Sequence, residues 1–72
     1  MRPFTELVEI GKAGGSIVLP PEKTYTPQQL MAIAAAVKQG GGRLIIQDAG
    51  RYQTDDLVRI SEAAPSHVYI YE

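Results

Sequence analysis

The chain contains no cysteine, no tryptophan and only one histidine among its 72 residues. The absence of cysteine excludes disulfide bonds and thiolate metal centres, and a single histidine argues against a histidine-based metal site. The longest uninterrupted apolar run, Leu30–Val37, spans eight residues. A transmembrane helix needs about 20 such residues. We therefore expect no metal ion, no cofactor and no membrane-spanning segment.

An excess of charge of one sign is also missing, because seven basic residues stand against eight acidic ones, for a net charge of −1. The basic residues are scattered among the acids and form no stripe that would attract nucleic acid or an anionic membrane. The N-terminal stretch "MRPFTELVEI" carries acidic residues where a signal peptide has its apolar segment. These features predict a cytoplasmic protein that binds neither nucleic acid nor membranes.

An internal repeat is the main feature that the sequence does contain. Sliding the sequence along itself by 27 residues aligns residues 17–36 with residues 44–63 without a gap. A shift of 50 residues aligns residues 7–19 with residues 57–69 in the same manner. Four pairs of the first alignment are identical: Tyr25 and Tyr52, Leu30 and Leu57, Ile33 and Ile60, and Ala36 and Ala63. The sequence therefore predicts a single domain of three helix–strand units, at about residues 3–20, 26–47 and 53–72.

The start of the middle helix has the clearest local signal. Thr26 is a good N-cap, Pro27 falls at the first helical position, and Gln29 stands three residues after the cap. This spacing predicts a capping box, in which each of the two polar side chains bonds the other residue's backbone N–H. Tyr25 precedes the cap and has the hydrophobic-staple spacing to Leu30, so we expect these two side chains to pack together.

The outer helices are predicted from the same kind of pattern. The first runs from roughly Pro3 to Lys12, where apolar residues recur at helical spacing. The third ends at Pro65, and its N-cap is either Gln53, from the alignment, or Thr54, from residue preference. The glycine-rich stretches "GKAGGS" and "KQGGGR" follow helices rather than strands, so we interpret them as helix stops and turns and not as phosphate-binding loops.

Three apolar segments, "SIVLP", "RLIIQ" and "HVYIYE", are predicted to be strands, and their helical connections require them to be parallel. Similar units favour stacking in the spatial order 1-2-3, and right-handed crossovers then place every helix on one face of the sheet. The expected fold is thus α/β, a short solenoid-like α–β–α–β–α–β chain. The alternative is the order 2-1-3, with helices on both faces.

The order 1-2-3 leaves one face of the sheet without a helical cover. In the alignment, Val18, Ile45 and Val68 share one face of the sheet. The opposite face carries the other apolar and aromatic strand residues: Ile17, Leu19, Leu44, Ile46, Tyr69 and Tyr71. The alignment does not determine which face the helices cover, but either bare face is largely apolar and of the size that marks an interaction site.

These features predict a non-enzymatic protein-interaction module that self-associates, with a dimer favoured, or docks on another protein. The last strand carries no lysine, proline or bulge to protect its edge. We therefore expect it to pair in antiparallel fashion with the same strand of a second copy, across a two-fold axis. The candidate interface residues are Ile17, Leu19, Leu44, Ile46, His67, Val68, Tyr69, Ile70 and Tyr71.

A small anion- or ligand-binding site, with or without catalysis, is the alternative function. It would lie at the strand-to-helix loops, where α/β enzymes hold their ligands. The polar and aromatic side chains gathered there are Lys23, Tyr25, Asp48, Arg51 and Tyr52. The order 1-2-3 has no topological switch point to form a crevice at these loops. We therefore expect a rim of turns there and no catalytic residue.

The pattern Y-[ST]-x3-L-x2-[IL]-A-x-A followed by glycine and an apolar strand resembles small, uncharacterised bacterial proteins with tandem helix–strand units. Tyr25, Thr26, Leu30, Ile33, Ala34, Ala36 and the segment 44–46 carry this resemblance in the middle unit. The third unit departs from it with Gln53 and Ser61. The period is also similar to that of leucine-rich repeats, whose strand motif and asparagine ladder are missing. The resemblance implies a fold and a bacterial source, and no catalytic residue.

Overall fold

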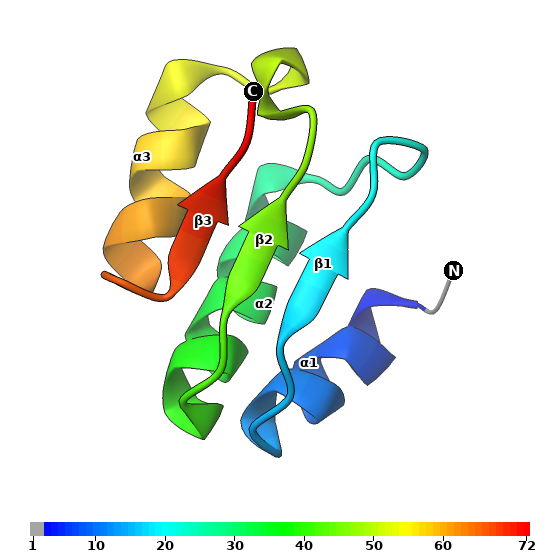
Figure 1. Ribbon diagram of the computed structural model, residues 1–72, viewed down its shortest axis with the longest axis vertical. Helices are drawn as coiled ribbons and strands as arrows, with labels where there is room; N and C mark the ends of the chain where they lie inside the picture. Colours follow the sequence, from blue (N-terminus) through cyan, green and yellow to red (C-terminus); the bar gives the residue numbers. More distant parts are fainter. Residues whose placement is uncertain (1–2) are drawn as a thin grey trace.

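The computed structural model describes residues 3–72 and has three helices and three strands in strict alternation (Figure 1). The strands are parallel, and their order in the sheet is β1-β2-β3. This confirms the α/β prediction and the 1-2-3 order against the alternative 2-1-3. The elements are α1 (Phe4–Lys12), β1 (Ile17–Leu19), α2 (Pro27–Gly40), β2 (Leu44–Ile46), the short 3-10 helix η1 (Ala49–Arg51), α3 (Thr54–Ala63) and β3 (Val68–Ile70).

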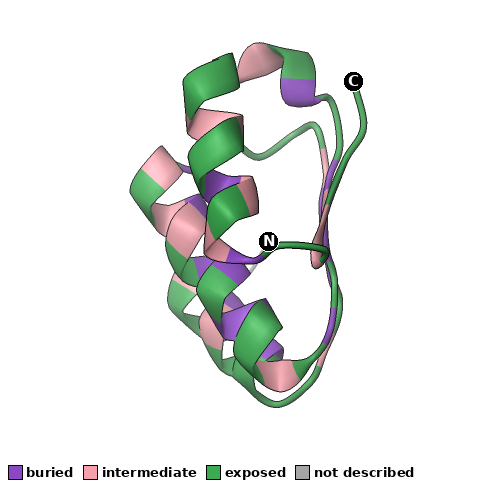
Figure 2. Cartoon of the chain, turned by 90° about the vertical axis from the view of Figure 1, so that its left-hand side faces the viewer, coloured by how far each residue is buried: buried purple, intermediate pink, exposed green. Residues whose placement is uncertain are grey.

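The helices and the sheet form two layers. Figure 2 shows the three helices together on one side of the sheet, and no element of residues 3–72 lies on its other side. The described helices include none that is long and apolar enough to cross a bilayer.

The local signals at the helix ends act as the sequence predicts. The Thr26 N–H donates to Gln29 Oε1 at 3.0 Å, and the Gln29 N–H donates to Thr26 Oγ1 at 3.2 Å, which completes the capping box of α2. Gly41 ends that helix in the left-handed region, with φ at 83°. The N-cap of α3 is Gln53, as the repeat alignment indicates, and its side chain makes no capping hydrogen bond.

The core lies between the helices and the helix-facing side of the sheet. Its largest fully buried side chains are Leu19, Leu30, Ile33, Val37, Leu44, Ile46 and Ile60. Tyr25 joins this cluster with only 3% of its surface exposed, together with Leu30, its staple partner. Residues of all three units therefore share one core, as near-identical stacked units require.

The predicted face of the third strand is wrong by one residue. Ile17, Leu44 and Val68 form one register row, so Val68 faces the helices and Tyr69 lies beside Val18 and Ile45. A one-residue slip moves every side chain of a strand to the opposite face. The slip comes from helix length, because α3 has ten residues and α1 has nine, while each is followed by a four-residue connection.

The helical layer is wider than the sheet. In Figure 1, α1 lies beyond the β1 edge and α3 lies beyond the β3 edge. Packed helix axes are about 8–10 Å apart, whereas neighbouring strands are only about 4.8 Å apart. Three helices centred on three strands therefore extend about 3–5 Å past each edge of the sheet. We refer to the projecting part of α3 as the α3 overhang.

Candidate interaction surfaces

The side of the sheet that faces away from the helices carries a row of apolar and aromatic side chains. Val18, Ile45 and Tyr69 lie side by side in register on β1, β2 and β3. Tyr71 follows on the same side by strand alternation. Val18 is 49% exposed and Tyr71 is 58% exposed. We call these four residues the outer face.

Polar contacts border the outer face at one end. The Arg43 guanidinium lies over the Tyr69 ring at 5.9 Å from its centroid. The His67 Nδ1 is 2.8 Å from the Gly42 carbonyl oxygen, which ties the start of β3 to the turn before β2. These contacts link the Tyr69 ring and the His67 imidazole to the two residues that precede β2.

The two edges of the sheet differ in the backbone groups that they offer. Leu44 N–H donates to the His67 carbonyl at 2.7 Å, and Tyr71 N–H donates to the Ile46 carbonyl at 2.9 Å. Since hydrogen-bonding groups alternate along a strand, the N–H and C=O groups of Val68 and Ile70 point to the open edge. At the other edge the corresponding position after Val18 is Pro20, which has no N–H. The β3 edge is therefore the better template for an added strand.

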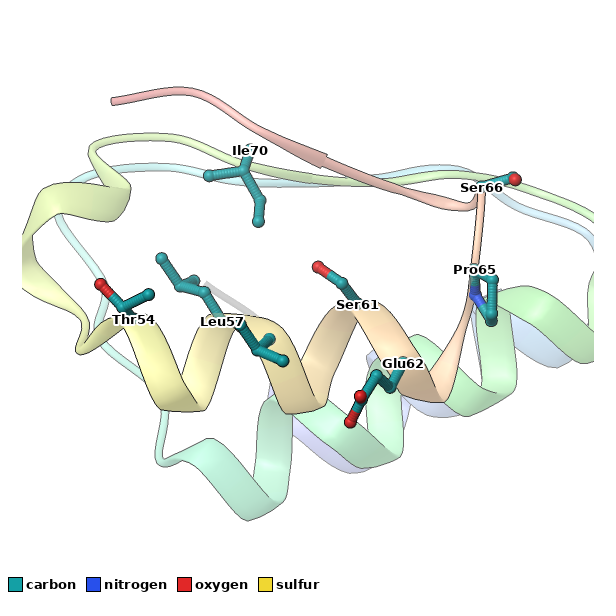
Figure 3. A pocket seen from close by; sticks show the side chains of 8 residues that line it. Thr54, Leu57, Ser61, Glu62, Pro65, Ser66 and Ile70 are labelled. Atoms are coloured by element: carbon teal, nitrogen blue, oxygen red, sulfur yellow. The ribbon is translucent and has the colours of Figure 1, made fainter.

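An open apolar groove of about 480 Å³ runs between α3 and β3, beneath the α3 overhang (Figure 3). Ile70 points into it from the strand, and Leu57 and Ser61 point toward it from the helix. Its complete lining is Thr54, Leu57, Val58, Ser61, Glu62, Pro65, Ser66 and Ile70. We call the groove and the adjoining β3 edge the edge slot.

Four residues of the predicted interface are buried beneath the helices. The helices cover the face that carries Ile17, Leu19, Leu44 and Ile46, and all four are core residues with at most 5% of their surface exposed. They pack against the apolar sides of the helices, which is what drives the sheet to bury this face. Tyr69 and Tyr71 lie instead on the outer face, and Ile70 lies in the edge slot.

The prediction from sequence missed the helical side of the edge slot. Leu57 and Val58 align with residues of the earlier units, where Leu7 and Leu30 are buried. In the third unit Leu57 is only half-buried, because no further unit follows α3 among the described residues. The signal that could have found the slot is the number of units within residues 3–72, since a unit at the end of a described stack has one flank without a neighbouring unit.

Arg51 forms a brace between the two strand-to-helix loops. Arg51 donates from Nη2 to the Pro20 carbonyl at 3.2 Å and to the Gln47 carbonyl at 3.4 Å. Its Nη1 donates to the Pro21 carbonyl, and to Thr24 Oγ1 at 3.3 Å. The guanidinium thus ties the loop before η1 to the loop before α2. An anion at Arg51 would have to displace these bonds.

The other predicted loop residues pack around this brace. Arg51 lies over the Tyr52 ring at 5.0 Å, and Lys23 lies over the Tyr25 ring at 5.6 Å. Burial, and then the neighbouring Tyr52, raise the pKa of the Tyr25 hydroxyl above its usual value of 10.0, so Tyr25 is neutral at physiological pH. Asp48 is exposed and makes the left-handed turn into η1, with φ at 54°. Both tyrosine rings therefore lie against basic side chains of these loops, and Asp48 makes a turn.

Replacing Arg51 with lysine should lower the free energy of unfolding by about 2 kcal/mol, because an ammonium group cannot reproduce a planar fork that reaches both loops. Urea unfolding followed by circular dichroism measures the difference. Arg59→Lys is the matched control, since Arg59 is 67% exposed and only 3.8 Å from Asp56 in a surface pair. That change should cost less than about 0.5 kcal/mol. Equal effects of the two variants would contradict the brace.

Within residues 3–72, no group of three or more histidine, cysteine, aspartate or glutamate side chains gathers as metal ligands would. Comparisons with models of protein families, with curated proteins and with solved structures found no match. The resemblance to bacterial tandem helix–strand proteins therefore stays a prediction. Function has to be inferred from the surfaces described above.

Proposed function

We propose that the protein is a non-enzymatic interaction module that self-associates through its outer face, with two sheets packed against each other and the helices outside. The observation that carries this proposal is the row Val18, Ile45, Tyr69 and Tyr71 on a sheet face that no element of residues 3–72 covers. A sheet face of this composition is ordinarily buried against a second layer. Two such sheets pack about 10 Å apart, and their inner side chains interdigitate.

The size of the face is consistent with a weak dimer. Perpendicular to its shortest axis the molecule measures 28 by 25 Å, and this is the side on which the sheet lies (Figure 1). That rectangle, about 700 Å², is an upper limit on the contact area per partner, and it is below the value of about 800 Å² for standard specific complexes. We therefore expect a weak dimer, with a dissociation constant in the micromolar range or above.

Pairing of two β3 edges, the arrangement first expected, is opposed by the α3 overhang. In an antiparallel pair the two-fold axis would pass about 2.4 Å outside β3, halfway between the strands. The α3 axis projects about 3–5 Å beyond the same strand, so the α3 helices of two copies would overlap. Packed helices need about 8–10 Å between their axes. For this reason we assign self-association to the outer face and not to the strand edge.

Changing Val18 to lysine should raise the dimer dissociation constant at least tenfold, because each lysine would carry a charge into the apolar contact. Sedimentation equilibrium at concentrations from micromolar to millimolar measures this constant. Val58→Lys is the matched control: Val58 is 48% exposed, against 49% for Val18, but lies on α3 away from the outer face. Val58→Lys should leave the dimer intact. A wild-type chain that stays monomeric at millimolar concentration, or equal effects of the two substitutions, would overturn the proposal.

A further inference from the structure

The edge slot joins two features that a sheet-extending peptide requires. The N–H and C=O groups of Val68 and Ile70 point outward along β3, and an apolar groove lies directly beside them. We propose that the edge slot binds an extended peptide segment of a partner protein, which adds to the sheet as a fourth strand. This inference goes beyond the proposed function, because it concerns a different surface and a different partner.

The central strand β2 shows how a strand on each side covers a side chain at this position. Ile46 and Ile70 are register partners on β2 and β3, and both face the helical layer. Ile46 has strands on both sides and is 0% exposed, whereas Ile70 has a strand on one side only and is 37% exposed. The remaining exposure of Ile70 is the area that a strand on its open side would cover.

The dimensions of the slot suit a short strand. Its lining on α3 extends from Thr54 to Glu62, and eight steps of about 1.5 Å give a length of about 12 Å. An extended chain rises about 3.3 Å per residue, so about four residues fit along the groove. Alternate side chains of such a strand would point down between Leu57 and Ile70, and backbone bonds to β3 would fix its register.

The α3 overhang selects the kind of partner. An added strand has room beside β3, but a helix packed on that strand would overlap α3. A partner strand that carries its own packed helix is therefore excluded. A segment without a covering helix fits. The only charged side chain in the lining is that of Glu62. An alternating apolar segment with a flanking basic residue is therefore the favoured ligand.

A capped heptapeptide of alternating valine and threonine with a lysine at each end is a direct probe. Titrated into isotopically labelled protein, it should bind with a dissociation constant below about 1 mM and shift the amide signals of Val68 and Ile70. Val58→Lys should weaken binding at least tenfold, because it places a like charge in the slot. Val18→Lys should bind the peptide as wild type does, although it is expected to break the dimer. The two valine substitutions therefore separate failure of this inference from failure of the outer-face dimer.

Removing one backbone donor tests the hydrogen bonds themselves. A chemically synthesised chain with an N-methyl group on Ile70 loses an outward N–H, and its peptide affinity should fall at least tenfold. N-methylation of Val18, on the opposite edge, is the matched control and should leave the affinity unchanged. A heptapeptide with proline at its centre should not bind. The proposal is overturned if the first peptide causes no shifts at millimolar concentration, if shifts are confined to the outer face, or if N-methyl-Ile70 protein binds normally.

Discussion

Gly40→Ala is expected to lower the free energy of unfolding by about 3 kcal/mol, because the helices α1 and α2 meet at backbone distance there. A Cβ on Gly40 would lie 2.0 Å from the Gly11 carbonyl oxygen and 2.7 Å from the Gly14 nitrogen. Both are backbone atoms, so relief requires the helices to separate. A domain of 72 residues has a total stability of only about 4–11 kcal/mol.

Gly50→Ala is the control for this change. A Cβ on Gly50 would have nothing within 4 Å, so alanine there should alter stability by less than about 0.5 kcal/mol. Urea unfolding monitored by circular dichroism compares both variants with wild type. If the two alanine variants unfolded at the same urea concentration, the close contact between α1 and α2 would not exist.

The glycines also mark a limit of what the sequence could predict. Their interpretation as helix stops and turns is correct for Gly14 and Gly41, whose φ angles of 99° and 83° favour glycine. The contact of Gly40 with Gly11 could not be predicted in the same way. It joins residues 29 positions apart, and it depends on where two whole helices cross, which no local pattern specifies.

The repeat predicted the architecture because residues close together in the sequence specify each helix–strand unit. The capping box at Thr26, the apolar helical spacing and the three apolar segments all act within about 20 residues. The face of β3 depended on a finer quantity, the length of α3. One additional residue there places Val68 opposite Leu44, where the alignment places His67. The ungapped alignment cannot represent one additional residue in a helix. It therefore predicted the correct elements and strand order but the wrong face for β3.

The candidate surfaces were predictable only in part, for a related reason. A bare sheet face follows from the 1-2-3 order, and this much was expected. Which residues lie on it depends on the face that the helices cover, and Ile17 and Leu44 prove to be core. Arg51 was expected in the strand-to-helix loops as a candidate ligand residue, but its bonds to carbonyls across two loops depend on the path of the backbone, which the sequence pattern does not specify.

The largest effect of a side-chain truncation is expected for Ile46→Ala, which should lower the free energy of unfolding by about 3–4 kcal/mol. Ile46 is 0% exposed in the central strand, and truncation leaves a cavity that neighbours on both sides cannot fill. Its register partner Ile70 is 37% exposed on β3. Ile70→Ala opens the edge slot to water rather than creating a closed cavity, and should cost about 1 kcal/mol.

Substitutions of Ile46 and Ile70 also test whether the sheet accepts a further strand beside β3. With the alternating heptapeptide at saturating concentration, bound peptide would cover Ile70 and raise the stability of the wild-type chain by linkage. Ile70→Ala should then lower the free energy of unfolding by more than it does without peptide. The substitution removes a contact with the peptide as well as one with α3. The cost of Ile46→Ala should not change, since no partner reaches that residue. Thermal unfolding of wild type and both variants, with and without peptide, measures these differences. Equal costs for the two isoleucines without peptide would mean that β3 is already covered and that the edge slot is closed.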